Sequence, residues 1–190
     1  MMYYENTLSI YCSFFEDIMD IKIVPDISVA YFGLVKEKEE YSESWDSLIA
    51  ELKDCGRYYL VRDVGLTTLP HCFRVVLPFY KENHEGLMLC ISMIGKLIGM
   101  YFSNYTKNTL VPIYLNCNTP EVVSYYPFSP RQEDEARFVL DLVNKHFPTF
   151  QKFDNTYASV PIQNIILGEQ VYRKVDLFQA IFSANVHGMI

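Results

Sequence analysis

Hydrophobic positions are densest in the middle of the chain, where two apolar runs flank a short break. Leu87–Ile94 and Leu97–Tyr105 are apolar or small at most positions, and Gly95-Lys96 separates them. Two such runs around a two-residue break that begins with glycine predict a tight β-hairpin with a type II′ turn, in which Ile94 lies opposite Leu97. Both runs carry apolar residues on both faces, so we expect a central hairpin that is covered on each side.

Further apolar stretches predict more strands. β-Branched and aromatic residues favour strands over 8–15 and 21–35 and, closer to the hairpin, over Tyr58–Val64, Cys72–Tyr80 and Leu110–Leu115. Counted from Tyr58, this is a run of about five strands in sequence order, and their simplest connection is an antiparallel meander.

A helical period begins after the charged stretch Lys36–Glu43, which we expect to be a solvated connection. Trp45, Leu48, Ile49 and Leu52 have the i, i+3, i+4, i+7 spacing that places them on one helix face. Ser42 or Ser44 is the expected cap, and Gly56 suits a left-handed stop.

A second helix is predicted from Ser129-Pro130. Serine as the cap, proline in the first helical position and Gln132 three residues after the serine form a capping box. The apolar stripe of this helix is Ala136, Val139, Leu140, Val143 and Phe147, and Pro148 ends it. A third helix is expected over Asp176–Ala184, with Leu177, Phe178, Ile181 and Phe182 buried.

Together these elements predict one α+β domain over residues 1–190, in which an antiparallel sheet, a meander of about five strands, carries at least three helices.

Composition narrows the class of protein. The chain has 190 residues, of which 50% are hydrophobic and 15% aromatic, and this is too apolar for a disordered protein. No run of about 18 apolar residues occurs, so we expect no membrane span. The N-terminus lacks the basic start of a signal peptide, and five widely spaced cysteines suit reduced thiols, so we expect a cytoplasmic protein.

The charge of the chain is acidic. Its formal net charge is −7 and its pI is near 5.1, which argues against nucleic-acid binding and is compatible with a basic protein partner.

Motifs for catalysis, metals or cofactors are missing from the sequence. Cys72 follows His71, but neighbours in a strand point to opposite faces, so this pair cannot cooperate directly. The histidines are isolated, no Cys-x-x-Cys occurs, and Gly95-Lys96 lacks the remainder of a phosphate-binding loop. We therefore expect no catalytic residue, no metal and no cofactor.

Candidate binding residues are two acidic clusters and a pair of tyrosines. The clusters are either plain solvated surface or docking sites for a cationic partner, and the tyrosines combine a large contact area with a polar tip. The predicted contacts are Glu37, Glu39, Glu40, Glu43, Tyr125, Tyr126, Glu133, Asp134 and Glu135.

A series of core and turn residues in the last third of the chain carries a resemblance to a known group of proteins. The series comprises Val143-Asn144-Lys145-His146-Phe147-Pro148, Phe150, Phe153, Ala158-Ser159-Val160-Pro161-Ile162, Gly168-Glu169 and residues 175–183. Over about residues 136–183, its order resembles the tail of some bacterial immunity proteins that accompany polymorphic toxins of contact-dependent or type VI secretion systems. The resemblance implies a non-enzymatic protein that binds one cognate toxin tightly and occludes its active site.

Two alternatives remain open at this point. One is a small enzyme whose site assembles from distant residues such as Cys72, His84 and Asp63. The other is a structural or scaffold subunit that forms a homo-oligomer.

Overall fold

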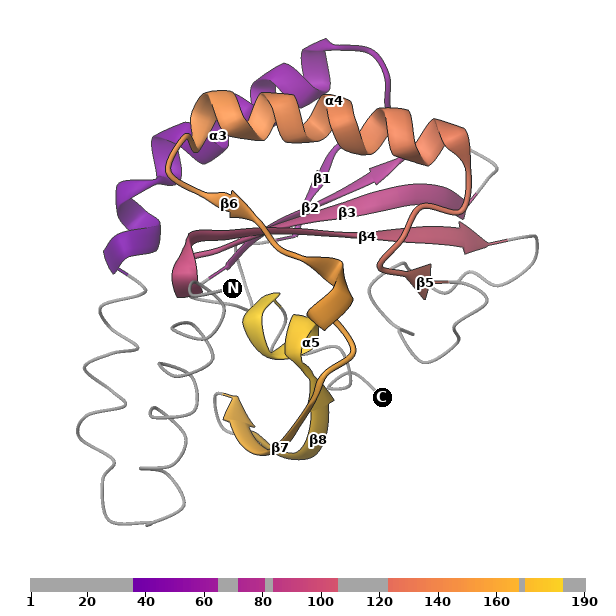
Figure 1. The fold of residues 1–190 in the computed structure, drawn as a ribbon. Helices are drawn as coiled ribbons and strands as arrows, with labels where there is room; N and C mark the ends of the chain where they lie inside the picture. Colours follow the sequence, from indigo (N-terminus) through magenta and orange to yellow (C-terminus); the bar gives the residue numbers. More distant parts are fainter. Residues whose placement is uncertain (1–35, 65–71, 81–83, 106–122, 168–169, 183–190) are drawn as a thin grey trace.

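The computed structural model describes residues 36–64, 72–80, 84–105, 123–167 and 170–182, and these form an α+β fold (Figure 1). The predicted strands at 8–15, 21–35 and Leu110–Leu115 lie outside these ranges. The elements are α3 (Ser42–Asp54), β1 (Arg62–Asp63), β2 (Cys72–Pro78), β3 (His84–Ser92), η1 (Ile94–Lys96), β4 (Leu97–Tyr105), β5 (Val123–Ser124), α4 (Pro130–His146), β6 (Gln151–Lys152), η2 (Asn155–Tyr157), β7 (Pro161–Leu167), β8 (Gln170–Asp176) and α5 (Leu177–Phe182). Among the described helices, none has the length and apolar character that a membrane crossing requires.

The main sheet is an antiparallel meander with one parallel addition. Strands β1 to β5 pair in sequence order, which confirms the predicted meander, although its fifth strand is β5 and the predicted Leu110–Leu115 lies outside the described residues. Strand β1 has only two residues of the strand expected over Tyr58–Val64. Two pairings on β4 were not predicted: the antiparallel pairing of β5 and the parallel pairing of β6.

The central hairpin is confirmed, but its predicted turn is wrong. Ser92, rather than Ile94, pairs with Leu97, and a four-residue connection replaces the two-residue turn. Both Gly95 (φ 67°) and Lys96 (φ 53°) adopt positive φ there, and the N–H of Lys96 donates to the C=O of Met93 at 3.3 Å. The register differs from the prediction by two residues, so every side chain keeps its expected face.

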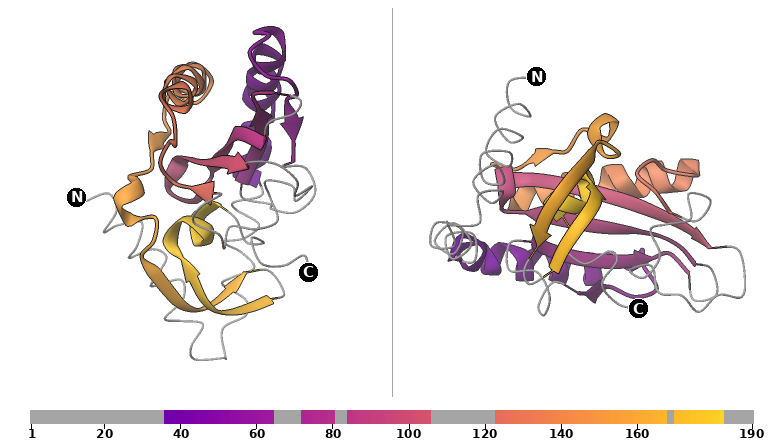
Figure 2. Two further views of the ribbon diagram at one scale, coloured as in Figure 1. Left: turned by 90° about the vertical axis from the view of Figure 1, so that its right-hand side faces the viewer. Right: turned by 90° about the horizontal axis from the view of Figure 1, so that it is seen from below.

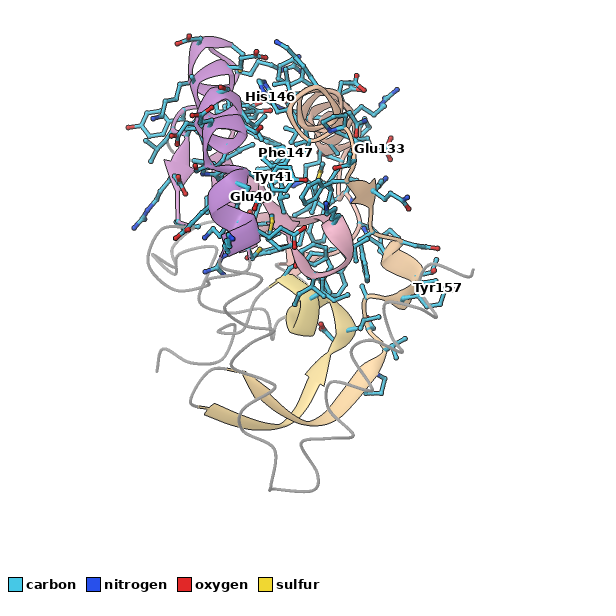
Figure 3. The ribbon with its side chains drawn as sticks, turned by 90° about the vertical axis from the view of Figure 1, so that its left-hand side faces the viewer. Glu40, Tyr41, Glu133, His146, Phe147 and Tyr157 are labelled. Atoms are coloured by element: carbon cyan, nitrogen blue, oxygen red, sulfur yellow. The ribbon has the colours of Figure 1, made fainter. Side chains whose placement is uncertain are left out.

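Helices α3 and α4 cover one face of the sheet, with alternate residues of β2, β3 and β4 beneath them (Figure 1). They run antiparallel, because Tyr41 before α3 stacks on Phe147 after α4 at 5.8 Å (Figure 3). The predicted stripe of α3, comprising Trp45, Leu48, Ile49 and Leu52, is fully buried. Burial of such side chains contributes about 1.5–3 kcal/mol each, so this stripe holds α3 on the sheet.

Helix α5 and the separate β7–β8 hairpin lie on the opposite side of the sheet (Figure 2). The predicted apolar face of α5 is buried, and the predicted last residues of this helix, 183–184, lie outside the described residues. A Cβ on Gly99 of β4 would lie 2.6 Å from the Phe182 ring, so glycine permits the close approach of α5. The central hairpin is therefore covered on both faces, as its sequence predicts.

The helix ends follow the predicted signals in part. The side chain of Ser129 accepts the N–H of Gln132, and Gly56 takes a left-handed conformation (φ 66°) directly after the C-cap of α3, so the predicted serine cap and glycine stop are confirmed. The reciprocal half of the predicted capping box differs, because the side-chain oxygen of Gln132 accepts the N–H of Phe128 and not that of Ser129. The predicted serine cap of α3 is wrong: its N-cap is Tyr41, without a side-chain cap. Residues 36–40 are themselves helical and not a solvated connection, because lysine and glutamate are good helix formers.

Candidate protein-binding surface

A groove lies between the outer edge of β4 and one side of α4. Its volume is about 560 Å³. Apolar side chains of β4 and α4 form its floor, and the segments on either side of α4 close its ends. The lining residues are Ile98, Met100, Phe102, Tyr126, Pro127, Glu133, Ala136, Arg137, Leu140, Lys152, Phe153, Asp154 and Asn155. We call this feature the β4 groove.

The β4 groove exists because two short strands share the outer edge of β4 and leave a gap. Strand β6 pairs with Leu97 and Ile98, and β5 pairs with Phe102 and Ser103. The C=O of Ile98 points to this edge, since it accepts the N–H of Phe153 at 2.8 Å. Backbone groups alternate along a strand, so the N–H and C=O of Met100 point to the same edge. Neither group is hydrogen-bonded to another described residue.

Charged side chains stand on both rims of the β4 groove. On the α4 rim, Arg137 forms an ion pair with Asp134, whereas Glu133 is exposed and has no ion-pair partner among the described residues. On the opposite rim, Asp154 accepts the N–H of Thr156 at 3.0 Å and its hydroxyl at 2.8 Å, and these bonds hold the pKa of Asp154 below its usual value. Lys152 also lines this rim, so among the groove carboxylates it is Glu133 that is exposed without an ion-pair partner in the described residues.

The two predicted tyrosines differ in their surroundings. The hydroxyl of Tyr125 donates to Asp176, and its ring packs on Phe178 at 4.7 Å, so Tyr125 fastens α5 to the sheet. Tyr126 is 54% exposed and lies on the lining of the β4 groove. Tyr126, just before α4, and Glu133, in its first turn, thus line the same groove.

The first acidic cluster lies on and before α3, away from this groove. Glu37 is half-buried and pairs with Lys96 at 3.3 Å. Glu39, Glu40 and Glu43 are exposed, and within the described ranges none forms an ion pair. Figure 3 shows Glu40 beside α3 and Glu133 beside α4, so the two acidic clusters are separate surfaces.

Glu135 does not belong to the surface. Its residue is only 4% exposed, and its carboxylate accepts two bonds from Nε of Arg57 (3.1 and 3.3 Å), one from Nη2 of Arg57 (3.0 Å) and one from the hydroxyl of Tyr58 (3.0 Å). Burial, and then the charge of Glu135, raises the pKa of Tyr58 well above its usual value. The expectation of a solvated contact residue is wrong here, because the residue lies on the side of α4 that faces the end of α3.

An exposed aromatic cluster was missed by the sequence reasoning. Four large apolar side chains are exposed near the ends of β1, β2 and α4: Tyr59 and Leu60 before β1, Tyr80 after β2 and Phe128 before α4. Arg131 of α4 lies over the ring of Tyr80 at 4.1 Å, and the N–H of Tyr59 donates to the C=O of Pro78. The sequence does not distinguish exposed Tyr59 from half-buried Tyr58, because both belong to the same apolar stretch.

The residues of the alternative enzyme site are not brought together. Cys72 pairs with Ser92, whereas His84 begins β3 and pairs with Tyr105, eight residues away along the same strand. This separation is about 27 Å in an extended strand, so the two residues cannot act on one substrate. The carboxylate of Asp63 accepts the indole N–H of Trp45 at 2.8 Å, and Cys72 is completely buried.

Within the part of the chain that the structure describes, no three His, Cys, Asp or Glu side chains are grouped so that they could hold a metal ion. Comparisons of the chain with models of protein families, with curated proteins and with solved structures find no match. Its function is therefore inferred from its residues and their geometry.

Proposed function

We propose that this protein is a cytoplasmic immunity protein, which binds a cognate protein toxin and covers the active site of that toxin. The resemblance of residues 136–183 to the tail of such proteins supports this function. In the structure, this stretch comprises most of α4, the parallel strand β6, the β7–β8 hairpin and α5.

The observation that carries the proposal is the excess of negative charge on α3 and on the segment before it. Residues 36–54 contain seven carboxylates and three lysines, and Glu39, Glu40 and Glu43 are exposed without a described ion pair. Such a surface attracts a basic partner over a distance and accelerates its association. We therefore infer that the toxin is basic and meets the α3 side.

The exposed aromatic cluster supplies contacts that can slow dissociation, which charge alone does not supply. Tyrosine and arginine are enriched among the residues that dominate binding energy at interfaces, and Tyr59, Tyr80 and Arg131 have this composition. Electrostatic attraction mainly sets specificity and association rate, whereas buried aromatic contacts slow dissociation.

Co-expression tests the proposal directly. Any toxin domain encoded beside this gene is induced with and without the protein, and the purified pair is titrated at low and high salt. We expect rescue of growth and a dissociation constant of about 1 nM, weakened by salt. A folded protein that neither rescues nor binds would refute the immunity function, and an affinity that salt does not change would remove the basic-partner inference.

A pair of charge reversals locates the contact. Glu40→Lys alters the exposed segment directly before α3, and Asp141→Lys makes the same change on the exposed face of α4. We expect Glu40→Lys to slow association about three- to ten-fold at low salt, while Asp141→Lys has a smaller effect. Equal effects would show that only net charge matters.

The aromatic cluster also favours a second candidate, a scaffold subunit that self-associates. Sedimentation of the wild-type protein and of Tyr80→Ser separates the two candidates. An obligate oligomer that Tyr80→Ser dissociates would support the scaffold, and a monomer at micromolar concentration would count against it.

A further inference from the structure

We infer that the β4 groove binds the tip of a loop of the partner protein, and that this tip carries one large apolar side chain next to a lysine or arginine. The inference rests on the proposed function for the identity of the partner, but the chemistry of the groove is tested separately.

The first reason is the open backbone of Met100. Its N–H and C=O point to the outer edge of β4 and are bonded to no other described residue, although Met100 is only 7% exposed. Backbone groups in such positions are nearly always paired in folded proteins. A peptide segment that adds to this edge supplies one acceptor and one donor together, as in recognition by strand addition.

The second reason is the length of the open edge. Ile98 and Phe102 are already paired with β6 and β5, and the four steps between them span about 14 Å. A long strand would collide with both neighbours. Only about three residues fit, and a loop tip presents a segment of that length while the remainder of the partner stays outside.

The third reason is the chemistry of the groove. Met100, Phe102, Ala136 and Leu140 form an apolar floor in a volume of about 560 Å³, which accommodates a large apolar side chain. At the rim, the carboxylate of Glu133 has no described ion-pair partner. A cation beside the apolar residue therefore complements Glu133, and the exposed ring of Tyr126 offers it a second contact.

A library of random seven-residue loops, each closed by a disulfide and displayed on phage, serves as the probe. The library is selected on the wild-type protein and counter-selected on Ala136→Trp, whose indole would fill the groove. Ala50→Trp, on the exposed face of α3, is the matched control. We expect enriched loops to contain a large apolar residue beside a basic one, and to bind Ala136→Trp at least about ten-fold more weakly than the wild type and Ala50→Trp.

Charge reversal provides an independent measurement, in case Ala136→Trp does not fold. Glu133→Lys is expected to weaken the selected loops about five- to ten-fold, while Asp141→Lys on the same helix changes their binding less than two-fold. No enrichment, loops without a basic residue, or equal binding to Glu133→Lys and Asp141→Lys would each overturn the inference.

Measurements with the toxin itself distinguish a failure of this inference from a failure of the proposed function. If the wild-type protein rescues cells and Glu133→Lys binds toxin as tightly as Asp141→Lys does, the groove assignment is wrong and the immunity function stands. If no rescue occurs but the selected loops bind the groove, the immunity function is refuted and the inference of a loop-binding groove stands. Self-association that Ala136→Trp abolishes would replace the partner loop by a second copy of this chain.

Discussion

The contact of Arg57 with Glu135 joins the end of α3 to the start of α4, and Arg57→Ala tests how strongly. The guanidinium makes three hydrogen bonds to a carboxylate that is only 4% exposed, and it also covers the Phe138 ring at 4.3 Å. Its removal leaves the carboxylate of Glu135 with the hydroxyl of Tyr58 as its remaining described partner.

The expected cost follows from the burial of the two partners. Removal of one member of a buried ion pair costs about 3–5 kcal/mol. The side chain of Arg57 is 40% exposed, so water reaches the pair and weakens it. We therefore expect Arg57→Ala to lower the free energy of unfolding by about 2–3 kcal/mol, of which about 0.5 kcal/mol comes from the lost contact with the Phe138 ring. Tyr58→Phe removes a single hydrogen bond and is expected to cost about 1 kcal/mol.

Urea denaturation of Arg57→Ala, Glu135→Gln and the double variant measures both the total cost and the coupling energy. We expect a coupling energy of at least about 1 kcal/mol. Lys145→Ala, which breaks an exposed ion pair with Glu51 between the same helices, is the control and should change stability far less. A loss below about 0.5 kcal/mol for Arg57→Ala, or additive single effects, would refute the reasoning.

Three further changes test other parts of the fold. Gly99→Ala is expected to destabilise the protein by about 1–3 kcal/mol in urea denaturation, because its Cβ would meet the Phe182 ring; an unchanged midpoint would show that α5 does not pack as described. Ser129→Ala should lower the free energy of unfolding by about 1–2 kcal/mol, since the cap on the N–H of Gln132 is lost. On heating, this variant should lose its helical circular dichroism at a lower temperature than the wild type. The pKa of Tyr58 is raised in the folded state, so the stability it contributes is complete below about pH 10 and is lost as pH rises above that value. Denaturation at pH 9 and pH 11 should therefore show a smaller alkaline loss for Tyr58→Phe than for the wild type, and equal losses would contradict this.

Local signals were sufficient for the main helices. The spacing of Trp45, Leu48, Ile49 and Leu52 identifies the buried face of α3, because side chains three and four residues apart lie on one side of a helix. Ser129-Pro130 marks the start of α4, because the serine supplies an acceptor to the orphan N–H groups and proline needs none.

Turn geometry was less predictable from the sequence than the strands themselves. The apolar runs locate β3 and β4, but the length of their connection depends on which residues adopt positive φ. Lys96 does so beside Gly95, and sequence reasoning assigns this conformation to glycine alone. The β7–β8 hairpin was missed, although isoleucine and valine on both sides of Gly168-Glu169 were a usable signal.

The acidic run at the start of α4 shows the limit of local charge. Glu133, Asp134 and Glu135 are equivalent in the sequence, yet the first lines the β4 groove, the second pairs with Arg137 and the third is buried against Arg57. Helical rotation of about 100° per residue separates their directions, but only the positions of α3 and β4 decide what each direction meets.

The sequence by itself determined the helices α3 and α4, the two-sided apolar hairpin, the α+β class and the acidic charge, because periodicity and composition are properties of neighbouring residues. Only the tertiary structure decided that β6 returns to β4 about fifty residues later, that Met100 is left open between β6 and β5, and that α4 completes the groove. These features depend on which distant segments bury their apolar faces against one another, and the free energy of that burial is not encoded in any one stretch.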